Sequence, residues 1–121
     1  NLMGMRAALA AYRDGQEWLD QVLHYLEGNR DYLAHFVSDH LPMLQMEKPE
    51  GTYLAWLDCR KAGIQGNPCE FFIREARVAM NDGETFGSGG KGFVRLNFAC
   101  SWVMLTQALE RMKRALEKAR G

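Results

Sequence analysis

The chain has 121 residues, of which 47% are hydrophobic and 25% charged, and its formal net charge is +0. This size and composition predict one soluble globular domain with a single core, and the balanced charge argues against a general electrostatic grip on nucleic acid or an anionic membrane. No apolar run has the length of a membrane span or the form of a signal peptide. Because the chain begins at Asn1 instead of methionine, we expect a piece of a longer protein.

The first third of the chain predicts two helices. Residues Leu2 to Tyr12 are rich in alanine, leucine and methionine and are followed by Asp14-Gly15, which favours a short helix that stops or bends at the glycine. From Gln16 to about His40 apolar residues recur every three or four positions, as on a long amphipathic helix. Gly28-Asn29 in its middle is compatible with a break or with a continuous bent helix. The apolar stripe resumes in register, which favours the bent helix.

The middle of the chain predicts a strand and then a helix. Residues Thr52 to Asp58 are apolar on both faces, so we expect a strand covered on each side, with Tyr53 and Trp56 in the core. Asn67-Pro68-Cys69-Glu70 supplies an N-cap, a proline at the first helical position and a glutamate three residues after the cap. A helix is therefore expected to begin there.

Two further strands and a helix are expected to complete the domain. Val78 to Met80 is predicted as a short strand before a turn at Asn81-Asp82-Gly83, Gly92 to Ala99 as the next strand, and Val103 to Ala119 as the last helix. The fold class is therefore α+β. We predict a small antiparallel or mixed sheet of about three strands with helices packed on one side, preceded by the long bent helix.

The candidate functional residue is an arginine within the last predicted strand. Alternation along this strand puts Val94, Leu96 and Phe98 on one face and projects Arg95 and Asn97 from the other. A guanidinium keeps its charge and offers a planar fork of donors that fits a carboxylate. The alternative is a structural arginine paired with a surface aspartate or glutamate.

The glycine-rich segment before this strand does not form a nucleotide-binding motif. A P-loop requires a glycine five residues before Gly90-Lys91, where Thr85 stands, and Lys91 is followed by Gly92 instead of serine or threonine. The segment is interpreted as a mobile loop, with an ordinary flexible hairpin connection as the alternative.

The cysteines and histidines predict neither a disulfide framework nor a metal site. Cys59, Cys69 and Cys100 are odd in number and widely spaced, and the three histidines lack the spacing of a helical metal pair. Cys100 is interpreted as a small buried hydrophobic residue and not as a nucleophile. A reducing cytoplasm is the expected compartment.

Several separated motifs resemble one enzyme family in order and spacing. The run Pro49 to Asp58 resembles the strand that opens the small C-terminal domain of class I/II, fold type I, pyridoxal-phosphate-dependent aminotransferases. Asp58-Cys59-Arg60, Asn81-Asp82-Gly83, Phe86 to Gly90 and Phe93 to Cys100 resemble the cystathionine β-lyase-like carbon-sulfur lyase subgroup of that family. The resemblance covers nearly the whole chain.

The resemblance implies roles for five residues. In this family pyridoxal 5'-phosphate is held by a lysine, and its ring draws electrons from the alpha carbon of an amino acid substrate. Arg95 then corresponds to the arginine that orients the substrate carboxylate, and Asn97 on the same strand face is expected to brace the guanidinium or the carboxylate. Gly51, Phe86 and Gly87 are expected to lie near the substrate.

The resemblance also implies what this chain lacks. Residues 1–14 correspond to the end of the large domain or a linker helix, and residues 15–121 to the small domain. The cofactor lysine belongs to the missing large domain, so we expect this chain alone to be inactive. The whole protein is expected to be a cytoplasmic homodimer that acts on cystathionine- or cysteine-type amino acids by β-elimination. The alternatives are an aminotransferase and, in a different class, a non-catalytic module that binds amino acids or has a regulatory role.

Overall fold

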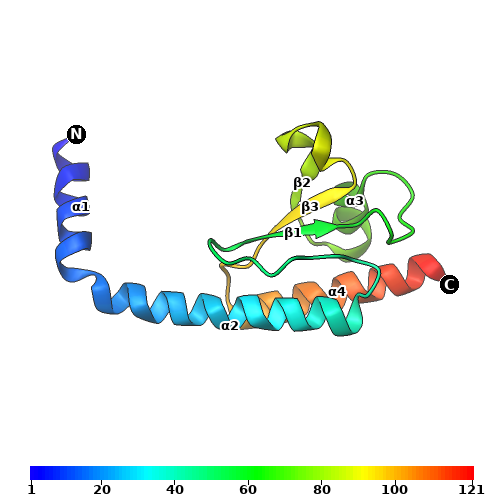
Figure 1. Cartoon of the computed structure of the whole chain (residues 1–121), viewed down its shortest axis with the longest axis horizontal. Helices are drawn as coiled ribbons and strands as arrows, with labels where there is room; N and C mark the ends of the chain where they lie inside the picture. Colours follow the sequence, from blue (N-terminus) through cyan, green and yellow to red (C-terminus); the bar gives the residue numbers. More distant parts are fainter.

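The computed structural model describes all 121 residues and consists of helices on a small sheet (Figure 1). The helices are α1 (Leu2–Asp14), α2 (Gln16–His40), α3 (Pro68–Phe71) and α4 (Trp102–Arg120). The strands are β1 (Leu54–Asp58), β2 (Asn81–Asp82) and β3 (Phe93–Asn97), and they form an antiparallel sheet in the order β1-β3-β2. The predicted α+β class with a three-stranded sheet is confirmed, and the sheet is antiparallel.

Local sequence signals account for most helix ends. Asn67 caps α3 as predicted, because its side-chain oxygen accepts the backbone N–H groups of Cys69 and Glu70. The chain turns sharply between α1 and α2 at Gly15 (Figure 1). A Cβ atom at this position would lie 2.5 Å from the carbonyl oxygen of Ala11, so the turn requires glycine. The second helix runs unbroken to its end, which confirms that Gly28-Asn29 does not interrupt it.

The core lies between the sheet and the paired helices α2 and α4, which run side by side along one face of the sheet (Figure 1). We call this face the inner face, and its side chains are Ala55, Leu57, Val94 and Leu96. The predicted inward residues of α4 are all buried: Leu105, Leu109, Met112 and Leu116. The helices therefore pack on one side, as expected from the apolar periodicity.

A buried asparagine ties α2 to the end of the sheet. The Asn29 amide donates hydrogen bonds of 2.9 Å to the carbonyl oxygens of both Phe98 and Cys100, and Asn29 is only 1% exposed. Buried polar groups are stable only when paired, and here one amide satisfies two backbone carbonyls just beyond β3. The pair of bonds fixes where the central strand leaves the sheet.

The position of β1 in the sheet differs from the sequence expectation. Residues 52–58 were expected to form a strand inside the sheet with cover on both faces. In the structure β3 is the central strand and β1 lies at an edge. Tyr53 is 46% and Trp56 37% exposed, so the prediction that both are core residues is wrong. For Trp56 the reason is that the helices cover only the inner face, while Trp56 points to the other. Tyr53 precedes β1 and lies beside the first half of α2, which has no buried residue.

The second strand also begins later than predicted. Val78 to Met80 is not a strand, because Arg77 adopts a left-handed conformation that ends a π-helical turn at Phe72–Ala76. The backbone N–H of Val78 then donates to the Phe72 carbonyl instead of to a neighbouring strand. The ladder with β3 starts only at Asn81, which was assigned to the turn.

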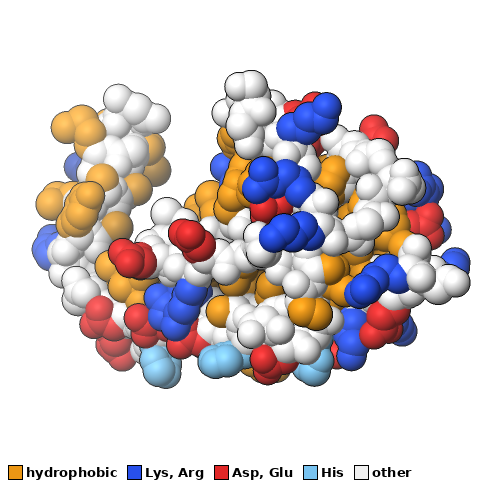
Figure 2. Space-filling model, turned by 45° about the vertical axis from the view of Figure 1, so that its right-hand side comes forward, with side chains coloured by type: hydrophobic (Ala, Val, Ile, Leu, Met, Phe, Trp, Pro, Cys, Tyr) orange, Lys and Arg blue, Asp and Glu red, His pale blue; other side chains and the backbone are white.

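The N-terminal helix has a different character from the rest of the molecule. It contains no buried residue, and it stands apart from the body with hydrophobic side chains on its surface (Figure 2). In α2 the buried residues begin only at Asn29, in the half that lies on the sheet. The boundary predicted between residues 1–14 and 15–121 falls at the turn between these helices and stays a prediction. No helix has both the length and the apolar character needed to cross a bilayer.

Candidate functional site

The candidate site lies on the face of the sheet that α2 and α4 leave uncovered, which we call the outer face. Strand register aligns one outward residue from each strand: Trp56 of β1 and Asn81 of β2 both pair with Arg95 of β3. Phe93 and Asn97 project on the same side, two residues away in either direction along β3. Arg95 is therefore at the centre of this face, flanked by an aromatic ring and an amide.

Arg95 has no acidic partner. Its Nη2 donates to Oδ1 of Asn81 at 3.2 Å, and its guanidinium carbon lies 4.3 Å from the centre of the Phe86 ring. The Nε atom is buried and has no hydrogen-bond acceptor. No aspartate or glutamate oxygen lies within 4.0 Å of the guanidinium. Within this chain Arg95 therefore forms no ion pair.

Aromatic rings surround the guanidinium on the outer face. Trp56 is stacked on Phe93 with ring centroids 5.4 Å apart and meets Phe86 edge-on at 5.7 Å. Such pairs hold flat rings in defined orientations, and the ring that lies over Arg95 attracts its positive charge. Together Trp56, Asn81, Phe86, Phe93 and Arg95 form what we call the outer-face site. It presents one uncompensated cation in an apolar, aromatic setting.

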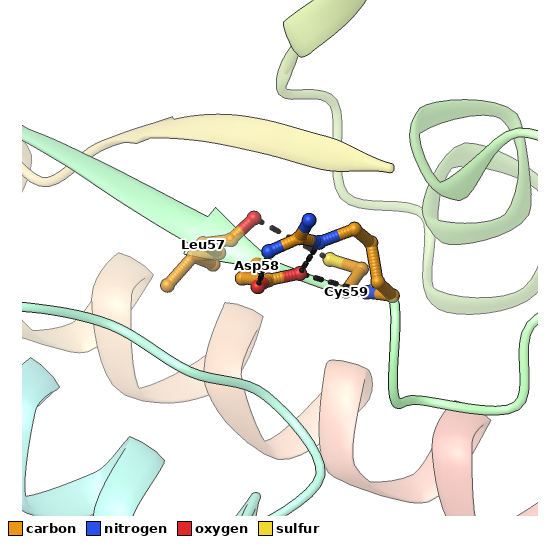
Figure 3. Close-up of polar contacts among 4 residues, drawn as sticks. Leu57, Asp58 and Cys59 are labelled. Carbon is orange, nitrogen blue, oxygen red and sulfur yellow. Dashed lines mark hydrogen bonds and ion pairs between the residues drawn. The ribbon is translucent and has the colours of Figure 1, made fainter. Parts of the chain in front are cut away.

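The Asp58 carboxylate at this end of the face is already paired. Asp58 accepts from the backbone N–H of Arg60 at 3.0 Å and from Nε and Nη2 of the same side chain at 2.9 and 2.7 Å (Figure 3). These hydrogen bonds lower the pKa of the Asp58 carboxyl below its ordinary value. The Arg60 guanidinium also lies 4.7 Å from the centre of the Phe93 ring. Asp58 and Arg60 therefore neutralise each other beside the aromatic rings.

The segment that carries Phe86 is folded into two 3-10 turns, Gly83–Phe86 and Ser88–Gly90. The turns are in backbone contact at Gly83 and Gly90, where a Cβ atom on either glycine would collide with the backbone of the other. Asp82 caps the first turn, because its carboxylate accepts the N–H of Glu84 at 3.0 Å. This framework holds the Phe86 ring over Arg95.

The structure brings together some of the predicted site residues and separates others. Phe86 contacts the Arg95 guanidinium, and Gly87 follows it directly with φ of 120°, which a residue with a side chain rarely adopts. Asn97 does not brace the guanidinium; its amide oxygen accepts the N–H of Ala99 at 2.8 Å. Gly51 precedes β1 and lines a separate shallow hollow of about 210 Å³ that does not include Arg95.

Sequence reasoning missed three contributors to this site, including Phe93, which was placed in the last strand but given no role at the site. Asn81 was assigned to a turn and Trp56 to the core, yet both flank Arg95 in the sheet. The available signal was alternation along residues 52–58, which places Trp56 opposite the buried Ala55 and Leu57. For Asn81 there was no local signal, since its place depends on pairing with a strand twelve residues away.

The cysteines offer no nucleophile or metal site. Burial, with a smaller effect of Asp58, raises the pKa of the Cys59 thiol to about 12, and burial also raises the pKa values of Cys69 and Cys100. All three are free thiols, and no cluster of three metal-ligating side chains occurs. Cys59 and Cys69 are buried, and Cys100 is partly buried.

Comparison with known proteins finds relatives that cover nearly all of this chain. No family model matches. A protein of Mycobacterium leprae is 43% identical over 127 residues, covering 94% of this chain and 32% of the relative. Cystathionine beta-lyase PatB of Bacillus subtilis is 37% identical over 117 residues, covering 96% of this chain and 30% of the relative. The chain thus spans about a third of the length of the curated relatives that it matches.

Solved structures give the same picture. The pyridoxal-phosphate-bound C-S lyase from Staphylococcus hominis superposes with a TM-score of 0.81 at 36% identity, covering 88% of this chain and 29% of that one. The aromatic aminotransferase from Pyrococcus horikoshii superposes with a TM-score of 0.82 at 28% identity, covering 94% and 31%. Both structures therefore share the fold of this chain.

Proposed function

The chain belongs to the fold type I family of pyridoxal-phosphate-dependent enzymes, and from that premise we propose that it is the substrate-carboxylate-binding small domain of a carbon-sulfur lyase. In this proposal the whole protein cleaves cystathionine- or cysteine-type amino acids by β-elimination, and residues 15–121 form its C-terminal small domain. The support is that the curated relatives from Mycobacterium leprae and Bacillus subtilis, at 43% and 37% identity, are described as cystathionine beta-lyases, whereas the curated aminotransferases are 27–28% identical.

The observation that carries the proposal is the uncompensated charge of Arg95. The Arg95 guanidinium is half-buried, has one amide partner and has a buried Nε without an acceptor. Burying such a donor and charge costs free energy unless an anion supplies the missing acceptors and the opposite charge. An amino acid substrate carries such an anion in its carboxylate, which matches the fork of donors. In this proposal Phe86 and Gly87 line the substrate, and Asn97 and Gly51 lie at its margin.

The residues of this chain do not make a site for the cofactor. Pyridoxal phosphate requires a lysine for attachment, a carboxylate for its ring nitrogen and donors for its phosphate. Lys48 is ion-paired with Asp31, and no lysine is hydrogen-bonded or ion-paired to a residue of the outer-face site. Asp58 is occupied by Arg60. We therefore assign the cofactor and its lysine to the remainder of the protein, and expect the 121-residue chain alone to release no pyruvate.

The test is substitution of Arg95 in the full-length protein, assayed by pyruvate release from L-cystathionine. Arg95→Gln keeps a planar polar group but removes the charge, and we expect kcat/KM to fall by about 100-fold or more. Arg95→Lys should restore only part of the activity, since an ammonium lacks the planar fork. Arg111→Gln, an exposed arginine on α4, is the matched control. An unchanged kcat/KM for Arg95→Gln would contradict the proposal.

An aminotransferase is the second candidate, because the chain also superposes on an aromatic aminotransferase along most of its length. A lyase and an aminotransferase both have to bind the substrate carboxylate, so the presence of Arg95 does not distinguish the two activities. Amino-group transfer to a keto acid without release of pyruvate would favour the aminotransferase. A homodimeric, cytoplasmic protein is part of the proposal in either case, and size-exclusion chromatography of the full-length protein tests the dimer.

A further inference from the structure

The side chain that holds Arg95 in place is an amide where a carboxylate would fit equally well. Asn81 and Arg95 are directly paired residues of β2 and β3, and the only hydrogen bond that the guanidinium makes goes to the amide oxygen of Asn81. Aspartate has the same shape and would form an ion pair here. The amide orients the guanidinium without neutralising it, so the positive charge stays available for a ligand.

The charged groups nearby do not neutralise Arg95 either. On β1 the outward Asp58 is bonded to Arg60, and on β2 the carboxylate of Asp82 accepts from Asn67 and from the N–H of Glu84. The carboxylates of Asp58 and Asp82 are therefore committed to other donors. An acid at position 81, directly opposite Arg95 in the ladder, would cancel the charge.

The strand that carries Asn81 is anchored from both sides. Asp82 accepts a hydrogen bond of 2.7 Å from the amide of Asn67, the N-cap of α3, and the Thr85 hydroxyl donates to the Asp82 carbonyl at 2.6 Å. This two-residue strand would otherwise have little to fix its place. The anchoring sets Asn81 opposite Arg95 before any ligand arrives, which is the condition for a preorganised binding group.

We propose that Asn81 is a positioning residue for substrate binding: it orients the Arg95 guanidinium through its amide oxygen and, because it is neutral, leaves the charge of Arg95 free for the substrate carboxylate. This inference rests on the proposed function of Arg95 and extends it to the residue that sets selectivity for a carboxylate over a neutral group. The identity of residue 81 thus sets how strongly the site prefers an anion.

The test is Asn81→Asp in the full-length protein, a change that keeps the shape and adds one negative charge. We expect the KM for L-cystathionine to rise about tenfold or more, because the new carboxylate competes with that of the substrate, while kcat changes little. The diagnostic measurement is the ratio of competitive inhibition constants for L-alaninamide and L-alanine, which differ in the carboxylate. That ratio should fall about tenfold in Asn81→Asp, whereas a purely structural disturbance would weaken both inhibitors alike.

Two further variants make the result decisive. Gln107→Glu makes the same amide-to-acid change at an exposed position of α4 and should leave the inhibition ratio unchanged. Arg95→Gln should abolish the preference for L-alanine. If Arg95→Gln lowers the ratio and Asn81→Asp does not, the role of Asn81 is overturned while the proposed function stands. If Arg95→Gln leaves the ratio unchanged, the proposed function fails and this inference fails with it.

Discussion

The two faces of the three-stranded sheet are built from the same strands but differ in role: one packs against the helices, and the other carries the candidate binding site. The inner face presents small and aliphatic side chains that are almost fully buried against α2 and α4. The outer face presents aromatic rings, an amide and a guanidinium; neither α2 nor α4 covers it, and the short 3-10 turn that carries Phe86 lies over part of it. Alternate residues along one strand therefore have different roles: the inner-face side chains stabilise the fold, and the outer-face side chains present a binding group.

Leu57 and Trp56 are neighbours on β1 that test this division most strongly. Leu57 is 0% exposed, so Leu57→Ala should lower the free energy of unfolding by about 2–5 kcal/mol. Trp56→Leu removes two aromatic contacts on the outer face and should cost only about 1 kcal/mol. Equilibrium urea unfolding of both variants measures the difference. Equal losses would mean that the outer face is also part of the core.

How much of this division the sequence could predict depends on whether its signals are local. Alternation along β3 and the Asn67 cap are local, and both were predicted correctly. Alternation does not say which strand is central, because this depends on pairing between residues such as Trp56 and Arg95 that lie far apart in sequence. The same holds for Asn81, whose role exists only once β2 is paired with β3. The unpredicted part of the site is therefore its non-local part.

The tie between α2 and the end of β3 gives the second largest expected effect. Asn29→Ala removes two buried donors and leaves the carbonyl oxygens of Phe98 and Cys100 unpaired, so we expect a loss of about 2 kcal/mol. Gly28→Ala is the matched control, since a Cβ atom there meets no neighbour within 4 Å and alanine favours the helix. It should stabilise the chain by about 0.5 kcal/mol. Urea unfolding of the two variants should thus give shifts of opposite sign.

The Asp58–Arg60 pair links stability to pH at the rim of the outer face. Because Arg60 lowers the pKa of Asp58 in the folded state, the pair stabilises the fold above the ordinary carboxyl pKa of 3.8. This stabilisation is lost as the pH falls through the lowered pKa. Asp58→Asn should cost about 1 kcal/mol at pH 7, a small value because Arg60 is largely exposed.

The pH dependence of this variant separates the ion pair from simple packing. The difference in unfolding free energy between the unmodified chain and Asp58→Asn should shrink as the pH is lowered from 5 toward the lowered pKa of Asp58, as measured by urea unfolding at each pH. Asp31 and Glu75 also have lowered pKa values, but they are present in both proteins and cancel in the difference. A constant difference across this range would show that Asp58 acts through shape alone.

Substitution of Phe86 has the smallest expected effect, and it tests whether the aromatic ring contributes to substrate binding by Arg95. Its ring lies over the Arg95 guanidinium and meets Trp56 edge-on, so Phe86→Leu keeps an apolar group but removes the attraction between ring and cation. In the full-length protein we expect the KM for L-cystathionine to rise about threefold, equivalent to roughly 0.6 kcal/mol, with little change in the stability of the fold. Phe86→Tyr retains the ring and should behave like the unmodified protein. If leucine and tyrosine gave the same KM, the ring would only fill space, and the orientation of Arg95 would depend on Asn81 alone.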